Sequence, residues 1–223
     1  MAGDYKTAVV VIVLIAMVLT LGMFTRFFPQ PINAASSAFG TASLTIEGLC
    51  IFDLAANWNF ISLCAEPLNK TVDSVTQSIS GDYDYILKWN ETSQAYDLYS
   101  IYATSKPFNE LEQNSSYFLH MTDSHTGFSV SGNTTGSMNI SLVNKWNSPS
   151  WPYEFARDVS RYMGTINGSW EYLLKWDATA QSYSLYSIYA ATKPFTQIFK
   201  GEGQFMYINA SSAVLVYNRT ALS

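Results

Sequence analysis

The sequence predicts a mainly β chain of the α+β class, in which an N-terminal apolar helix precedes two duplicated small β-rich domains, each with one short helix. Three observations predict this fold: an uncharged apolar run at residues 8–25, a segment that occurs twice, and short β-prone runs separated by turns. We expect the helix at 1–29, a neck and entry strand at 30–56, the first repeat at 57–143 and the second at 144–223.

The apolar run, AVVVIVLIAMVLTLGMFT, contains no charged residue. As a helix it spans about 27 Å, and Phe27 and Phe28 extend it to about the 30 Å of a bilayer core. A cleavable signal peptide usually has a shorter apolar stretch, so we expect a retained helix, either in a membrane or in the core of an assembly. Its assembly contacts are predicted at Val11, Leu14, Ile15, Ala16, Val18, Leu19 and Gly22.

Pro29 and Pro31 are expected to end this helix, because proline cannot continue its hydrogen bonding. Residues 32–42 are small and polar, which is typical of a neck. The apolar, β-prone residues 43–54 predict an entry strand, and WNFISL at 58–63 predicts the next one.

Two segments predict the short helices. Residues 71–80 and 154–163 place apolar side chains at spacings of three and four, as on the core face of a helix. Gly81 and Gly164 follow these segments as expected C-terminal stops.

The repeat is clearest in LYSIYA, which stands at 98–103 and again at 185–190. A shift of 87 residues aligns 85–108 with 172–195, and 16 of these 24 positions are identical. Self-similarity at a fixed spacing indicates a duplicated structural unit, and two copies favour tandem domains over a solenoid.

Each copy reads as a hairpin followed by two further strands, at 83–89, 95–102, 117–121 and 128–131 in the first. Both faces of the LYSIYA strand carry large apolar side chains, so we expect a central strand that is covered on both sides. Its tyrosines are interpreted as core, with a sugar-binding platform and a subunit interface as alternatives. Trp89 and Trp176 are expected in equivalent buried positions.

The residues after the apolar run carry the marks of an extracellular protein. Cys50 and Cys64 are the only cysteines, and in an oxidising exterior they are expected to form a disulfide; two buried free thiols are the alternative. Eight Asn-x-Ser/Thr sequons predict N-glycosylation, at Asn69, Asn90, Asn114, Asn133, Asn139, Asn167, Asn209 and Asn218.

Composition argues against several functions. The net charge is −5 and no basic run exists, so the sequence lacks the electrostatic pattern of a nucleic-acid binder. No nucleophile, phosphate-binding or zinc motif is found, and the two histidines, His120 and His125, have no counterparts in the second copy. We therefore expect no enzymatic activity, no metal and no cofactor.

Two resemblances concern the place of the chain in the cell. The run VIVLIAMVLTLGMF resembles the N-terminal helix of archaeal type IV pilins and archaellins, which implies helices bundled in a filament core beneath a β-rich, often glycosylated domain. The segment NWNFISL at 57–63, with the helix and hairpin after it, resembles the tandem WNLISLP-type modules of prokaryotic surface proteins, and Trp146-Asn147 matches its start in the second repeat.

Together these patterns predict a structural subunit of an archaeal surface filament, which self-associates and passes through the membrane before assembly. A single-pass membrane-anchored surface or virion glycoprotein is one alternative. A carbohydrate-binding adhesin, with a surface glycan as partner, is another.

Overall fold

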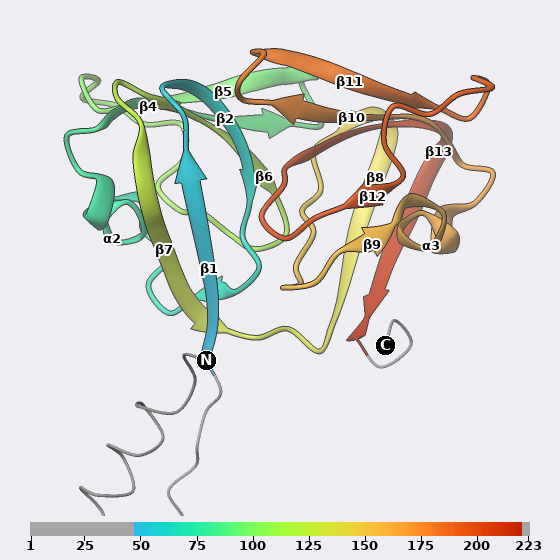
Figure 1. The fold of residues 1–223 in the computed structure, drawn as a ribbon, viewed down its shortest axis with the longest axis horizontal. Coiled ribbons are helices and arrows are strands. Elements are labelled where there is room, and N and C mark those ends of the chain that lie inside the picture. Colours follow the sequence, from blue (N-terminus) through green and yellow to red (C-terminus); the bar gives the residue numbers. More distant parts are fainter. Residues whose placement is uncertain (1–46, 220–223) are drawn as a thin grey trace, which may run out of the picture. The chain divides into compact units, whose positions relative to one another are not determined.

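The computed structural model describes residues 47–219, which form a mainly β structure with several antiparallel sheets and two short helices (Figure 1). The predicted apolar helix and most of the predicted neck lie outside the described residues. The elements are β1 (Glu47–Leu54), β2 (Asn57–Ser62), β3 (Glu66–Pro67), α2 (Val72–Val75), η1 (Gln77–Ile79), β4 (Tyr83–Asn90), β5 (Ala95–Ser100), β6 (Ser116–Met121), β7 (His125–Asn133), β8 (Ser137–Asn147), β9 (Arg157–Asp158), α3 (Val159–Tyr162), η2 (Gly164–Ile166), β10 (Trp170–Asp177), β11 (Ser182–Ser187), β12 (Gln197–Ile198) and β13 (Gln204–Asn218).

We call residues 47–133 the first half and residues 137–219 the second half; both belong to one compact unit. The first half contains the sheets β2-β6-β4-β5 and β1-β7-β3, and the second half contains β11-β10-β13-β8 and the small pair β12-β9. The strand order is therefore the same in the two four-stranded sheets, with β8, β13, β10 and β11 in the places of β2, β6, β4 and β5.

Two long strands of the second half take the places of four shorter strands of the first half. In the first half, β2 pairs with β6 and β1 pairs with β7. In the second half, one pair of strands, β8 and β13, makes both sets of contacts, with a register irregularity between Ile208 and Ser212. The predicted repeat boundary between residues 143 and 144 falls inside β8.

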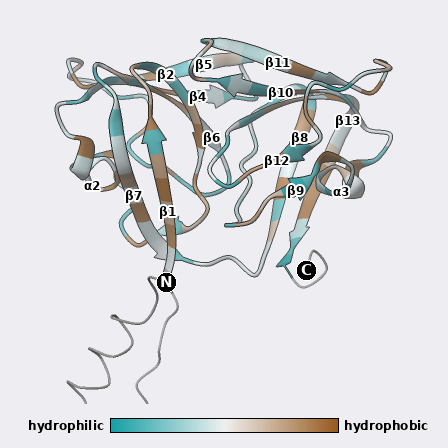
Figure 2. Cartoon of the chain, in the orientation of Figure 1, coloured by the Kyte–Doolittle hydropathy of each residue, from teal (hydrophilic) through white to brown (hydrophobic). Residues whose placement is uncertain are grey.

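Three apolar clusters hold the unit together. One lies within the first half and includes Ile86 and Tyr99, and a second lies within the second half around the fully buried Trp151. The third contains Phe60, Phe118 and Phe205, and so joins the two halves. Hydrophobic and hydrophilic stretches alternate along the strands in Figure 2, because successive strand residues point to opposite faces.

The two predicted helical segments do form short helices. Val72, Val75 and Ile79 are buried, as are Val159 and Tyr162 in the second half. Each α-helix has only four residues and is followed by a 3-10 turn.

The predicted stop at Gly164 is wrong, because this glycine begins the 3-10 turn η2. Gly168 instead occupies the place of Gly81. Both have positive φ angles, 81° and 96°, in a region that glycine adopts without steric penalty.

The expectation of a central LYSIYA strand is wrong. Among residues 47–219, β5 and β11, which carry its first three residues, are edge strands in their sheets, and the chain turns immediately after Ser100 and Ser187. Alternating apolar residues show that two faces of a strand are apolar, but they do not show whether a second neighbour pairs with its outer edge.

The predicted disulfide is present. Cys50 in β1 is bonded to Cys64, which follows β2, across a Cα–Cα distance of 5.6 Å. Both side chains are buried, so the bond lies inside the first half and ties the entry strand to it. Among residues 47–219, no helix is long and apolar enough to span a membrane.

We predict that replacing both cysteines, Cys50→Ala with Cys64→Ala, lowers the free energy of unfolding by about 3 kcal/mol, because a cross-link over about 15 residues restricts the unfolded chain. Urea unfolding without reductant measures the difference. Reductant should bring the parent to the stability of the variant and leave the variant unchanged. Equal stability of the two proteins in non-reducing buffer would contradict a stabilising role.

Candidate functional surfaces

The two halves exchange backbone hydrogen bonds in a reciprocal pattern. The amide of Ser62 donates to the carbonyl of Gly201 (2.9 Å), and that of Gly203 donates to Phe60 (2.9 Å). The counterparts are Ser150 donating to Asn114 (3.4 Å) and Ser116 donating to Ser148 (2.9 Å). Each contact thus recurs with the halves exchanged, as across the two-fold axis of a symmetric dimer.

Two tryptophans and two glutamines extend this exchange. Trp89 Nε1 donates to the carbonyl of Trp146 (2.9 Å), and Trp176 Nε1 donates to the carbonyl of Trp58 (2.9 Å). The Trp89 and Trp176 side chains are therefore in equivalent positions, as expected, but they are half-buried at the junction of the halves.

Gln94 donates to the Trp146 carbonyl (2.9 Å) and accepts from its amide (3.0 Å). Gln181 makes the same pair of bonds to Trp58, at 2.9 and 3.1 Å. Each glutamine thereby satisfies both backbone polar groups of one tryptophan in the other half. The glutamines have φ angles of 52° and 51°, so even their uncommon backbone conformation is repeated.

In each Trp-Asn dipeptide, the asparagine side chain forms hydrogen bonds with the backbone four residues earlier. Asn59 bonds the amide and carbonyl of Ala55 (2.9 and 2.7 Å), and Asn147 bonds those of Val143 (2.9 and 2.8 Å). Both side chains are buried. Each asparagine thereby holds the backbone on the N-terminal side of its tryptophan.

The cluster between the halves is aromatic. Phe60 and Phe118 stack with their ring centroids 4.2 Å apart, while Trp89 meets Phe205 edge to face with a centroid distance of 4.7 Å. The Tyr96 and Tyr183 hydroxyls lie 3.5 Å apart, where equivalent residues of the two halves meet. Partial burial raises the pKa of both phenols, although 38% of Tyr96 and 40% of Tyr183 remain exposed, and the hydrogen bond to Tyr96 raises the pKa of Tyr183 further.

Further exposed apolar residues follow these two tyrosines along the chain in each half, on the surface of the unit. We call this surface the aromatic band. It consists of exposed residues of β5, β11 and the turns that follow them: Tyr96, Leu98, Ile101 and Tyr102 in the first arm, and Tyr183, Leu185, Ile188 and Tyr189 in the second. Leu98 and Leu185 are each 47% exposed, and Tyr102 and Tyr189 are 72% and 67% exposed. In Figure 1 both strands lie on the upper side of the unit.

The repeated Lys-Pro-Phe segments fasten the ends of the band. Lys106 donates to the carbonyl of Ser100 and lies 4.5 Å above the Tyr99 ring. Lys193 donates to Ser187 and lies 4.8 Å above Tyr186. Each lysine thus satisfies the last carbonyl of an edge strand and holds the following turn against that strand.

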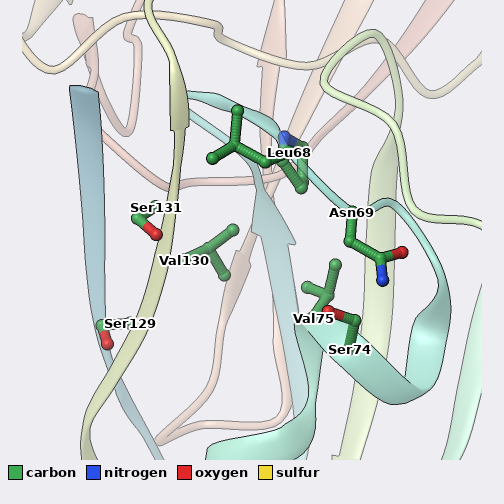
Figure 3. Close-up of a pocket in the computed structure, with 8 residues that line it drawn as sticks. Leu68, Asn69, Ser74, Val75, Ser129, Val130 and Ser131 are labelled. Carbon is green, nitrogen blue, oxygen red and sulfur yellow. The ribbon is translucent and has the colours of Figure 1, made fainter. Parts of the chain in front are cut away.

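Among the described residues the titratable side chains form ion pairs and one surface network, in which Lys70 contacts Glu66 and Glu112 and Lys88 also contacts Glu112. His120 Nδ1 lies 2.6 Å from Asp84, and His125 Nδ1 lies 3.0 Å from Asp82. Among the described residues no group of three potential metal ligands occurs. A hollow between α2 and β7, with Asn69 at its rim (Figure 3), is lined by Val75, Val130 and uncharged neighbours.

The sequon asparagines lie on the surface, and seven of the eight are exposed: Asn69, Asn114, Asn133, Asn139, Asn167, Asn209 and Asn218. The eighth, Asn90, is half-buried, and its Nδ2, the atom that would carry a glycan, donates to Asp97 (3.2 Å). Asn69 has the opposite arrangement, because its Oδ1 accepts from the hydroxyl of Thr71 (2.9 Å).

Sequence reasoning did not predict the part played by Gln94 and Gln181. A signal was present, since both are among the 16 positions at which the aligned segments are identical. The partners of these glutamines could not be predicted, because an identical residue in both repeats does not show which backbone groups it binds.

The chain was compared with protein-family models, with curated proteins and with solved structures, and no match was found in any of the three comparisons.

We predict that Gln94→Ala and Gln181→Ala each lower the free energy of unfolding by about 1–3 kcal/mol, because each leaves the backbone amide and carbonyl of one tryptophan with fewer partners. Chemical denaturation measures the change. Gln77→Ala, at an exposed position in η1, is the matched control and should be neutral. A loss no larger than that of the control would mean that the glutamines do not hold the halves together.

Proposed function

We propose that the chain is a structural subunit of an archaeal surface filament, with the apolar segment at residues 8–25 polymerising in its core and the β unit outside. The observation that carries the extracellular part is the buried Cys50–Cys64 disulfide beneath a surface with seven exposed sequon asparagines. A disulfide persists in oxidising compartments, and glycans require exposed sites.

The finer architecture belongs to the same proposal. The apolar helix precedes two duplicated β-rich domains, each with one short helix. Support comes from the 16 identical residues at a spacing of 87, from the shared strand order and from the reciprocal contacts between the halves. A duplicated unit of this kind serves as a rigid exterior for a subunit that self-associates through another segment.

The filament form depends on the apolar segment. Val11, Leu14, Ile15, Val18 and Leu19 leave no polar face on a helix, so both lipid and a protein core suit it. A single-pass membrane-anchored surface or virion glycoprotein therefore remains the alternative. The exposed tyrosines of the aromatic band favour a further candidate, a carbohydrate-binding adhesin.

We predict that native protein has a mass well above the 24.9 kDa of the bare chain, with sugar on several of the seven exposed asparagines and none on Asn90. Glycopeptide mass spectrometry measures site occupancy, and alkylation without reductant should label no cysteine. A bare mass with two alkylated cysteines would place the unit on the cytoplasmic side of the membrane.

We predict that Ala16→Leu with Gly22→Leu prevents filament formation, because a tightly packed core is overpacked by about 1–3 kcal/mol per site. Electron microscopy of purified native material is the measurement. Leu14→Ile, which conserves volume, is the control and should assemble. A parent that is recovered only as dispersed membrane-bound monomers, or a double variant that assembles normally, would favour the lipid anchor.

A further inference from the structure

The aromatic band combines two features that favour binding of a partner. Its side chains are apolar and exposed, with Leu98, Leu185, Tyr102 and Tyr189 among the most prominent. Its strands are also sheet edges, since among residues 47–219 nothing pairs with the outer side of β5 or β11. Unpaired edges present backbone donors and acceptors to another strand, and a contiguous apolar patch on a folded domain usually marks an interaction site.

The band has the symmetry of the junction beneath it. Tyr96 and Tyr183 meet at 3.5 Å, and from there the two arms run outward with equivalent residues in the same order. A partner that fits one arm fits the other after a half-turn. A second copy of this chain carries the same two arms and the same relation between them, so it can engage both at once in an isologous contact.

Charge favours one arrangement of the two copies. Strand β5 contains the half-buried Asp97, whereas the equivalent position in β11 is Ser184 and that strand has no charged residue. Placing β5 against β5 of another copy would bring two aspartates near each other, which is unfavourable. Placing β5 against β11 avoids this repulsion in both halves of the contact.

The position of the band is also compatible with anchoring. In Figure 1, β1 begins and β13 ends on the lower side of the unit, while β5 and β11 lie on the upper side. Two copies that meet through their bands therefore keep the starts of their β1 strands pointing apart. Copies that belong to different assemblies can meet in this way.

We propose that the aromatic band is a homotypic docking surface, through which β5 of one copy lies against β11 of a second copy and β11 against β5. This inference rests on the proposed function in one respect, the self-association of the chain, but it uses a surface separate from the apolar segment. The contact joins subunits head to head and adds to any contact made by residues 8–25.

The test uses the full chain in mild detergent and two single substitutions, Leu98→Cys and Leu185→Cys, at equally exposed positions. A short bis-maleimide should join the two variants to each other when they are mixed, and differential tags identify the mixed product on a reducing gel. Val214→Cys, on β13 and 49% exposed, is the matched control and should not be joined to either variant. Absence of the mixed product, or products only between identical variants, would overturn the proposal.

A second variant checks the energetics. Leu98→Lys with Leu185→Lys should weaken head-to-head association by about tenfold or more, measured by sedimentation, since lysine on an edge strand opposes pairing. Val214→Lys should sediment like the parent, and circular dichroism should show both variants folded. Unchanged association of the double variant would overturn homotypic docking. So would the absence of the mixed cross-linked product, together with a parent chain that binds glycan and a double variant that no longer binds it. A loss of filaments in the variant Ala16→Leu with Gly22→Leu tests the proposed filament only. The docking surface is tested separately, by the cross-linking and sedimentation results.

Discussion

The exchange of backbone hydrogen bonds between residues 60–62 and 201–203, and between 148–150 and 114–116, is the constraint on which the unit depends. It brings the inner faces of the two four-stranded sheets together around Phe60, Phe118 and Phe205. Without the second half, the first would expose Phe60 and Phe118 together with Trp89 and Leu87. The halves are therefore separate in their own cores but mutually dependent at their junction, and Gln94 and Gln181 complete that dependence with side-chain bonds.

Much of the fold could be predicted from local sequence. The β-prone runs, the two short helices and the disulfide follow from spacing and residue type, because each is determined by a few neighbouring residues or by a single pair of cysteines. The edge position of β5 could not be predicted, because sheet order is set by contacts distant in sequence. For the same reason the lengths of β8 and β13 could not be predicted, because these strands pair with each other over two stretches that meet at the register irregularity between Ile208 and Ser212.

The candidate surfaces were predictable to different degrees. Sequons are local motifs, but the burial of Asn90 and its bond to Asp97 arise only when β4 and β5 pair. The repeat identified LYSIYA as a unit, and its tyrosines were expected to lie mainly in the core. Tyr99 does lie there, while Tyr102 and the preceding Tyr96 are exposed. The difference reflects the two faces of a strand whose outer edge has no neighbour among the described residues.

The disulfide has a mechanical consequence that follows from where it lies in β1. β1 and β7 are antiparallel, with Glu47 opposite Asn133. A force that pulls on the chain ahead of residue 47 would load this pair from its end and open its hydrogen bonds one after another. Only Glu47, Gly48 and Leu49 can separate in this way before the load reaches Cys50 and passes through its covalent bond to Cys64. The strand that receives tension first is thus fastened three residues from its start, and the rest of the unit is shielded from unzipping.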